Sequence, residues 1–170
     1  MKEFDEPMCV DHSQDNFCQE ADLDVPEEIS KLLINQPFAV LATQGDGQPY
    51  ASIISFACSS DLKNIVFSTP LNTRKYSLLS QSDKVALFVD NRSTVPPGVN
   101  KVSGVTITGK SKIINNSPEF SKWADLLVNK HSYLDSFVKS PSNALILVDV
   151  YRYFLVRRFQ EVFEWNPCQK

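Results

Sequence analysis

Six segments rich in β-branched and aromatic residues follow one another along this chain of 170 residues, and turn sequences separate them. Such segments are typical of β-strands. They cover residues 38–44, 48–59, 65–69, 84–90, 101–114 and 143–159. The segments do not alternate regularly with helices, which indicates mostly antiparallel neighbours. Because closure removes exposed edges, six antiparallel strands of uneven length close most easily into a small barrel. The sequence therefore predicts a mainly β fold built on a six-stranded antiparallel barrel.

The last segment is long, and its two faces differ in polarity. Strict alternation places four residues on one face: Asp149, Tyr151, Tyr153 and Arg157. The other face carries Val148, Val150, Phe154 and Val156. We therefore expect the two tyrosines to share a face with the carboxylate.

Three stretches have helical spacing of apolar residues. The first covers residues 24–36, where Asp24 is a candidate N-cap with Glu27 three residues later. The second covers residues 73–82. The third covers residues 115–138, with Ser117 as its expected cap. It forms either one helix or a helix followed by a second short one after His131.

Composition indicates one globular domain with an extension. Residues 1–23 are acidic and polar without any period, so we expect a flexible or surface-wrapping amino-terminal extension. Residues 24–170 form the expected domain, and 42% of the whole chain is hydrophobic, which is enough to bury a core.

Charge and hydropathy disfavour several classes of protein. Seventeen basic and 20 acidic residues give a net charge of −3, so nothing indicates nucleic-acid binding. The longest apolar run is broken by Asp149 and is too short to span a bilayer, and the amino end lacks the apolar core of a secretory signal. We expect a cytoplasmic protein. The four cysteines show no close-pair spacing, so we expect reduced thiols and no metal site.

Two adjacent cations, Arg74 and Lys75, stand in the first turn of the second expected helix. The amino end of a helix carries a partial positive charge, so each cation there costs about 0.3–1 kcal/mol. Free backbone N–H groups, the Thr73 hydroxyl and the two cationic side chains would together suit a phosphate dianion. From the residues alone, a phosphate site and a pair of solvated surface cations remain alternatives.

Three stretches resemble one family of flavoproteins: "GQPYASIISFA", "IVFSTPLNTRKYSLLSQSDKVALFV" and the carboxyl-terminal "FQEVFEW". The chain is similar there to the FMN-binding split-barrel family, which includes pyridoxamine 5'-phosphate oxidase. The resemblance implies a Greek-key split barrel that binds FMN. It also implies a homodimer with FMN at the subunit interface.

The same resemblance implies a set of cofactor-binding residues. The positions that match the family's phosphate and ribityl site are Ser68, Thr69, Thr73, Arg74 and Lys75. The strand that would lie along the isoalloxazine ring contains Ser52, Ile53, Ile54 and Ser55. We expect the two serines to hydrogen-bond the ring edge. Trp165 matches an aromatic residue that often lies beside the flavin of the partner chain.

Some family features are missing from this chain. Pyridoxamine phosphate oxidases have a basic residue where this chain has Ser52, a lysine near the position of Ala57, and a terminal arginine–histidine motif where this chain ends "EWNPCQK". We therefore do not expect vitamin B6 oxidation. Haem-degrading relatives rely on a histidine in a carboxyl-terminal extension, whereas the last histidine here is His131.

Three functions follow from these patterns. The first is an FMN-dependent oxidoreductase that passes electrons from a reduced nicotinamide to a small organic acceptor. The second is a non-catalytic protein of the same fold that binds flavin, haem or a deazaflavin. The third is a barrel without a cofactor that serves as an interaction module. No residue has the features of a dedicated catalytic acid or base.

Overall fold

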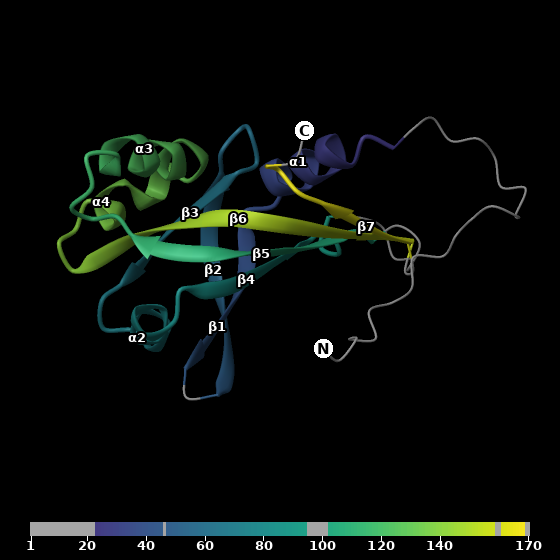
Figure 1. Cartoon of the computed structure of the whole chain (residues 1–170). Helices are drawn as coiled ribbons and strands as arrows, with labels where there is room; N and C mark the ends of the chain where they lie inside the picture. Colours follow the sequence, from purple (N-terminus) through teal and green to yellow (C-terminus); the bar gives the residue numbers. More distant parts are fainter. Residues whose placement is uncertain (1–22, 46, 95–101, 159–160, 169–170) are drawn as a thin grey trace, which may run out of the picture.

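The computed structural model describes residues 23–45, 47–94, 102–158 and 161–168, so the expected extension over residues 1–23 lies almost wholly outside the described part. Seven strands and four α-helices form the described fold (Figure 1). The strands are β1 (Phe38–Gly45), β2 (Gln48–Cys58), β3 (Asn64–Pro70), β4 (Lys84–Asp90), β5 (Gly104–Ile113), β6 (Asn143–Arg157) and β7 (Glu161–Trp165). The helices are α1 (Val25–Asn35), α2 (Arg74–Gln81), α3 (Phe120–Lys130) and α4 (Asp135–Val138).

Six of the strands close into the expected antiparallel barrel. Their hydrogen-bonded order is β3-β2-β1-β4-β5-β6, and β6 pairs back with β3 to complete the circuit. The prediction of a mainly β fold on a six-stranded antiparallel barrel is therefore confirmed. A seventh strand that the sequence did not indicate, β7, pairs antiparallel with the carboxyl-terminal part of β6.

The barrel is split because two of its strands change partners along their length. In β2, residues Gln48–Ser55 pair with β1, whereas the segment from Phe56 to Cys58 pairs with β3. In β6, the first part pairs with β3 and the part from Tyr153 onward pairs with β7. Helix α2 packs against β1 and β3 beside the half of β2 that β3 leaves unpaired.

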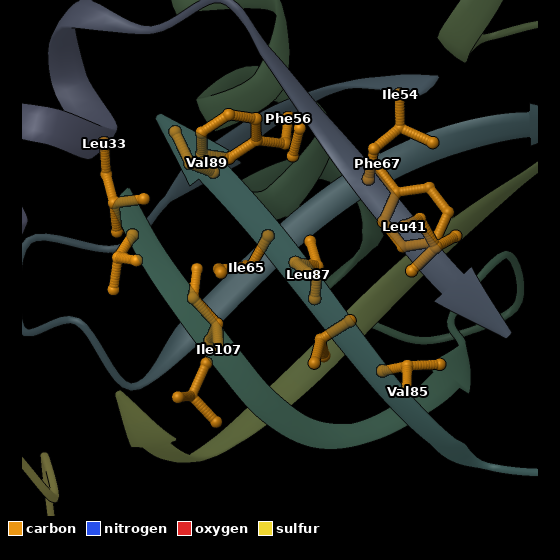
Figure 2. Packing of buried hydrophobic residues seen from close by; sticks show 14 of the residues in the cluster. Leu33, Leu41, Ile54, Phe56, Ile65, Phe67, Val85, Leu87, Val89 and Ile107 are labelled. Carbon is orange, nitrogen blue, oxygen red and sulfur yellow. The ribbon is translucent and has the colours of Figure 1, made fainter. Parts of the chain in front are cut away.

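The barrel interior holds the main hydrophobic core. Its residues alternate along the strands and meet at the barrel axis, as Figure 2 shows for Leu41, Ile54, Phe56, Ile65, Phe67, Leu87 and Ile107. A second cluster lies on the outer side of the barrel, where α3 covers Ala57, Val66 and Leu147 with Trp123 and Leu127. Strands β2, β3 and β6 are thus covered on both faces in this region.

A bulge in β6 changes which of its residues face the core. Thr108 of β5 pairs with Arg152 whereas Gly109 pairs with Val150, so Tyr151 is the extra residue. Strict alternation breaks at this point, and the expectation that Tyr151 and Tyr153 share a face with Asp149 is wrong. Tyr153 is fully buried, and its hydroxyl donates a 2.6 Å hydrogen bond to the carbonyl of Leu62.

The helix boundaries follow local capping chemistry in part. Asp24 caps α1 as predicted, because its carboxylate accepts the N–H of Glu27 at 3.1 Å. Helix α3 begins later than expected, since the Ser117 hydroxyl accepts the N–H of Glu119 in a turn that precedes the helix. A short 3-10 helix and α4 follow His131, which confirms the two-helix alternative. Within the described residues, no helix has the length and apolarity needed to cross a membrane.

Candidate functional site

The amino end of α2 is organised by Thr73. Its hydroxyl donates to the carbonyl of Pro70 at 2.9 Å, so it acts as the acceptor for the N–H of Tyr76 at 3.3 Å and for the hydroxyl of Thr69 at 3.1 Å. The single proton of this hydroxyl is therefore used within the loop. Thr73 shapes the helix start, but its hydroxyl does not offer the donor that the sequence suggested.

Two backbone donors remain at this helix end. The N–H groups of Arg74 and Lys75 have no acceptor among the described residues, as is usual for the first turn of a helix. They lie where the helix dipole is positive, so they are available to an anion.

The two cations beside these N–H groups lack a carboxylate partner. Arg74 is exposed, and its guanidinium lies 5.1 Å from the centroid of the Tyr50 ring. The Lys75 ammonium donates to the carbonyl of Ile53 at 3.1 Å, and burial lowers the pKa of this amine. Among the described residues, neither side chain forms an ion pair. Two positive charges thus stand uncompensated next to β2.

The β2 segment beside α2 presents two different faces. Ser52 and Ile54 point toward the barrel interior, and the Ser52 hydroxyl oxygen is buried without a hydrogen-bond partner among the described residues. Ile53 and Ser55 point outward, and the Ile53 residue is 69% exposed. The two serines therefore cannot both contact one face of a ligand through their side chains.

Ser68 and Thr69 of β3 are also on opposite faces of their strand. The Ser68 hydroxyl donates to the carbonyl of Ala144 at 3.0 Å. Thr69 is buried, and its hydroxyl is bonded to Thr73. Both residues support the loop before α2, and neither hydroxyl has a proton left for a ligand.

The structure places Trp165 far from these residues within one chain. Trp165 pairs with Tyr153, and their rings lie 5.5 Å apart. Pro70, next to the α2 loop, pairs with Asn143 at the opposite end of β6. At about 3.3 Å per residue, the two ends of this strand segment are roughly 30 Å apart. Within a single chain, Trp165 does not belong to the site at α2.

Two residues that sequence reasoning did not assign to the site contact β2. The hydroxyl of Tyr133 lies 3.2 Å from the Ser55 hydroxyl and 3.3 Å from Nδ1 of His131. The His131 ring is buried, and its Nε2 lies 2.9 Å from the carbonyl oxygen of Phe56. The sequence signal is weak: a histidine and a tyrosine two residues apart, directly after a helix.

The neighbouring Lys130 joins three elements behind the same strand. Its ammonium donates to the carbonyls of Leu33 at 2.7 Å and Gln36 at 2.8 Å, at the carboxyl end of α1. It also lies 3.9 Å from the centroid of the Phe56 ring. Burial lowers the pKa of Lys130 to about 8. The lysine holds α1 and α3 together over β2.

The fold is shared with several solved structures. A heme binding protein from Mycobacterium smegmatis is 13% identical with a TM-score of 0.77, over 87% of this chain and 60% of that one. Campylobacter jejuni ChuZ is 10% identical with a TM-score of 0.74, over 86% and 61%. This chain thus spans about three fifths of the length of these two proteins.

A third similar structure is closer to this chain in length. It is a Clostridium acetobutylicum protein related to general stress protein 26, of the pyridoxinephosphate oxidase family. It is 17% identical with a TM-score of 0.63, over 83% of this chain and 93% of that one. At such identities the likeness shows the fold alone.

Comparison of sequences gives the family. No curated protein matches this sequence. The family model described as pyridoxamine 5'-phosphate oxidase, however, matches residues 25–164, which is most of the chain and covers every strand of the barrel. The chain therefore belongs to the pyridoxamine 5'-phosphate oxidase family.

Proposed function

We propose that this protein binds FMN and acts as an FMN-dependent oxidoreductase, passing electrons from a reduced nicotinamide to a small organic acceptor. The observation that carries the proposal is the uncompensated pair of cations at the amino end of α2. Arg74 and Lys75 have no carboxylate partner among the described residues, and two backbone N–H groups beside them have no acceptor. A phosphate dianion would turn this unfavourable charge arrangement into a stabilising one.

The phosphate group of FMN fits the donors that this helix end offers. The Arg74 guanidinium is exposed and keeps its fork of N–H groups for phosphate oxygens while its plane lies near Tyr50. The Lys75 ammonium uses one of its three donors on Ile53 and keeps two. Charge-assisted hydrogen bonds of this kind contribute roughly 1.5–3 kcal/mol each.

The outer face of β2 supports the placement of the flavin ring. Ile53 offers exposed apolar surface directly beside the two cations, and Ser55 adds a hydroxyl two residues further along the strand. When bound, FMN would supply the electron-transfer chemistry, and the chain would supply binding, orientation and electrostatics. Ser52 lies on the inner face, so its role would be limited to the strand backbone.

We also propose that the protein is a homodimer with FMN at the subunit interface. The outer faces of β2, β1 and β4 form a continuous apolar row, because Ile53 pairs with Val40 and Val40 pairs with Phe88. Ile53 and Phe88 are exposed in the single chain, as is Phe38. Exposed apolar patches of this kind mark interaction surfaces. A partner chain could also bring its Trp165 to the site.

A haem-binding role is the second candidate, because a heme binding protein has a similar fold. One feature of this chain weighs against it. The described part contains one histidine, His131, and both of its ring nitrogens are engaged in hydrogen bonds. It is therefore not free to bind iron. A deazaflavin with a phosphate would use the same α2 site as FMN.

The test is identification of the ligand that the purified protein carries. We expect a yellow protein with flavin absorbance bands, and FMN in the mass spectrum of the released ligand. Bleaching of these bands by NADH or NADPH would support the oxidoreductase over a non-catalytic carrier. A haem Soret band, or a colourless protein that takes up no added FMN, would contradict the proposal.

A further inference from the structure

A chain of hydrogen bonds connects the outer face of β2 to a buried histidine. It runs from the Ser55 hydroxyl to the Tyr133 hydroxyl at 3.2 Å and on to Nδ1 of His131 at 3.3 Å. It ends where Nε2 of His131 meets the carbonyl oxygen of Phe56 at 2.9 Å. The Tyr133 residue is 67% exposed, so the chain begins at the surface and ends in the core.

The Phe56 carbonyl at the buried end fixes the direction of each hydrogen bond in this series. A carbonyl oxygen cannot donate, so Nε2 of His131 must carry the proton. In a neutral ring Nδ1 then has a free lone pair, which accepts the hydroxyl proton of Tyr133. Since this proton points to the histidine, the remaining contact requires the Ser55 hydroxyl to donate to the Tyr133 oxygen. The Ser55 proton is thus used inside the protein.

Burial keeps the histidine neutral. Loss of hydration lowers the pKa of His131, and the adjacent Lys130 charge lowers it further, while the Phe56 carbonyl acts in the opposite direction. Among the described residues, the polar groups that act on the ring are the Phe56 carbonyl, the Tyr133 hydroxyl and the charge of Lys130. At neutral pH the ring therefore remains an acceptor at Nδ1.

We propose that His131 and Tyr133 fix Ser55 as a hydrogen-bond acceptor, so that this part of the site selects a ligand N–H group. The inference rests on the proposed FMN site. Oxidised FMN has one ring N–H, at N3, between two carbonyl groups. The lone pairs of Ser55 suit this N–H and repel a carbonyl oxygen or a carboxylate. The serine therefore accepts a hydrogen bond from the ring and orients it, which gives a direction to the ring-edge hydrogen bond that the sequence predicted.

The role of Ser55 as a hydrogen-bond acceptor also distinguishes between the candidate cofactors. A haem propionate presents only acceptor oxygens, so it gains nothing from the oxygen of Ser55. An imide N–H gains a hydrogen bond. His131 acts through Tyr133, and Tyr133 acts through Ser55, so both are positioning residues.

The experiment compares binding of FMN and of 3-methyl-FMN, which lacks the N3 proton. Fluorescence titration of the wild type should show FMN bound more tightly by about two- to tenfold, the range of one hydrogen bond. Tyr133→Phe frees the Ser55 proton to rotate toward the ligand, so the preference should shrink toward unity. Ser55→Ala should also abolish it. Tyr151→Phe changes an exposed tyrosine that takes no part in these hydrogen bonds, so this variant should keep the wild-type preference for FMN.

The outcomes separate this inference from the proposed function. If the wild type fails to bind FMN at all, the proposed function is wrong. If it binds FMN but Tyr133→Phe and Ser55→Ala keep the full preference, the preference is steric and the inference is wrong. A second measurement needs no ligand: the ¹⁵N NMR spectrum of His131, assigned with His131→Gln, should show the Nε2–H tautomer. A proton on Nδ1 would reverse the direction of the hydrogen bonds between His131, Tyr133 and Ser55, and would overturn the inference by itself.

Discussion

Arg74 and Lys75 are the residues on which the proposed cofactor site depends most. Each places a positive charge at a helix end that already repels it, and neither is compensated by a carboxylate in the described structure. We expect Arg74→Ala combined with Lys75→Ala to weaken FMN binding by several kcal/mol in total, at roughly 1.5–3 kcal/mol for each charge-assisted interaction. Fluorescence titration of the apoprotein with FMN would measure the loss of affinity.

The matched control for this variant is Lys63→Ala combined with Lys84→Ala. It removes two exposed cations outside α2, Lys63 in the turn before β3 and Lys84 at the start of β4, and therefore keeps the change in net charge the same. FMN affinity should be close to that of the wild type. Unchanged flavin occupancy in the Arg74 and Lys75 double variant would exclude the phosphate site at α2.

At the level of single residues, the sequence predicted positions better than it predicted hydrogen bonds. The spacing around Thr73 indicated a helix start, and Thr73 is indeed the cap. The Thr73 hydroxyl donates its proton to the carbonyl of Pro70. This hydrogen bond depends on the folded loop, so the spacing of residues could not predict it. The contact between Ser55 and Tyr133 joins residues 78 positions apart, so no local pattern could have indicated it.

Between elements, Lys130 fastens α3 to the carboxyl end of α1. Lys130→Met keeps an unbranched side chain one atom shorter but leaves the carbonyls of Leu33 and Gln36 without this donor. We expect the free energy of unfolding to fall by about 1–3 kcal/mol, as measured by denaturant titration at pH 7. Lys122→Met is the control, because Lys122 is exposed on the same helix and lies over Trp123. It should cost less than about 1 kcal/mol.

The contribution of Lys130 should also depend on pH. Its pKa is about 8 in the folded chain and near the ordinary 10.5 when unfolded. Between these two pKa values the unfolded chain binds more protons than the folded chain. The contribution of Lys130 to the free energy of unfolding therefore rises with pH. The wild type should therefore gain stability relative to Lys130→Met between pH 8 and 10. Parallel stability curves for the two proteins would contradict this assignment.

The β6 bulge depends on a close backbone approach at Gly109. A Cβ at this position would collide with the carbonyl oxygen of Asp149, which is backbone and cannot rotate away. We expect Gly109→Ala to lower the free energy of unfolding by about 1–3 kcal/mol. Gly45→Ala offers a matched comparison, since its Cβ would meet the side-chain ends of Leu78 and Gln81 and no backbone atom. Equal losses in the two variants would show that the bulge does not require glycine.

Most strands and helices could be predicted because their signals are local. The range expected for β4 agrees at both ends with the observed Lys84–Asp90. Strand β7 was missed because the chain after β6 includes Arg158 with φ of 46°, and an arginine gives no turn signal of the kind glycine gives. The faces of β6 were misassigned because the bulge at Tyr151 depends on pairing with β5.

Considered as a whole, the barrel places its candidate site where the sheet opens. The first half of β2 has one partner strand, and Lys75 binds a carbonyl of that half instead of a second strand. The cations, the exposed Ile53 and Ser55 thus share one open surface. A closed circuit of strands without this split would leave no strand edge for α2 to approach.

The proposed dimer can be tested on that open surface. Phe88 lies outside the residues assigned to the cofactor, but it is exposed on β4 and belongs to the apolar row that reaches Ile53 through Val40. A carboxylate introduced there would have to be buried unpaired in an interface, so Phe88→Asp should convert the dimer to a monomer. Sedimentation analysis would show the change in mass, and FMN occupancy should fall with it if the partner chain completes the site. Ile34→Asp, an equally polar change at an exposed position of α1, should leave both unchanged. A wild type that is monomeric at micromolar concentration yet retains FMN would show that one chain holds the cofactor alone.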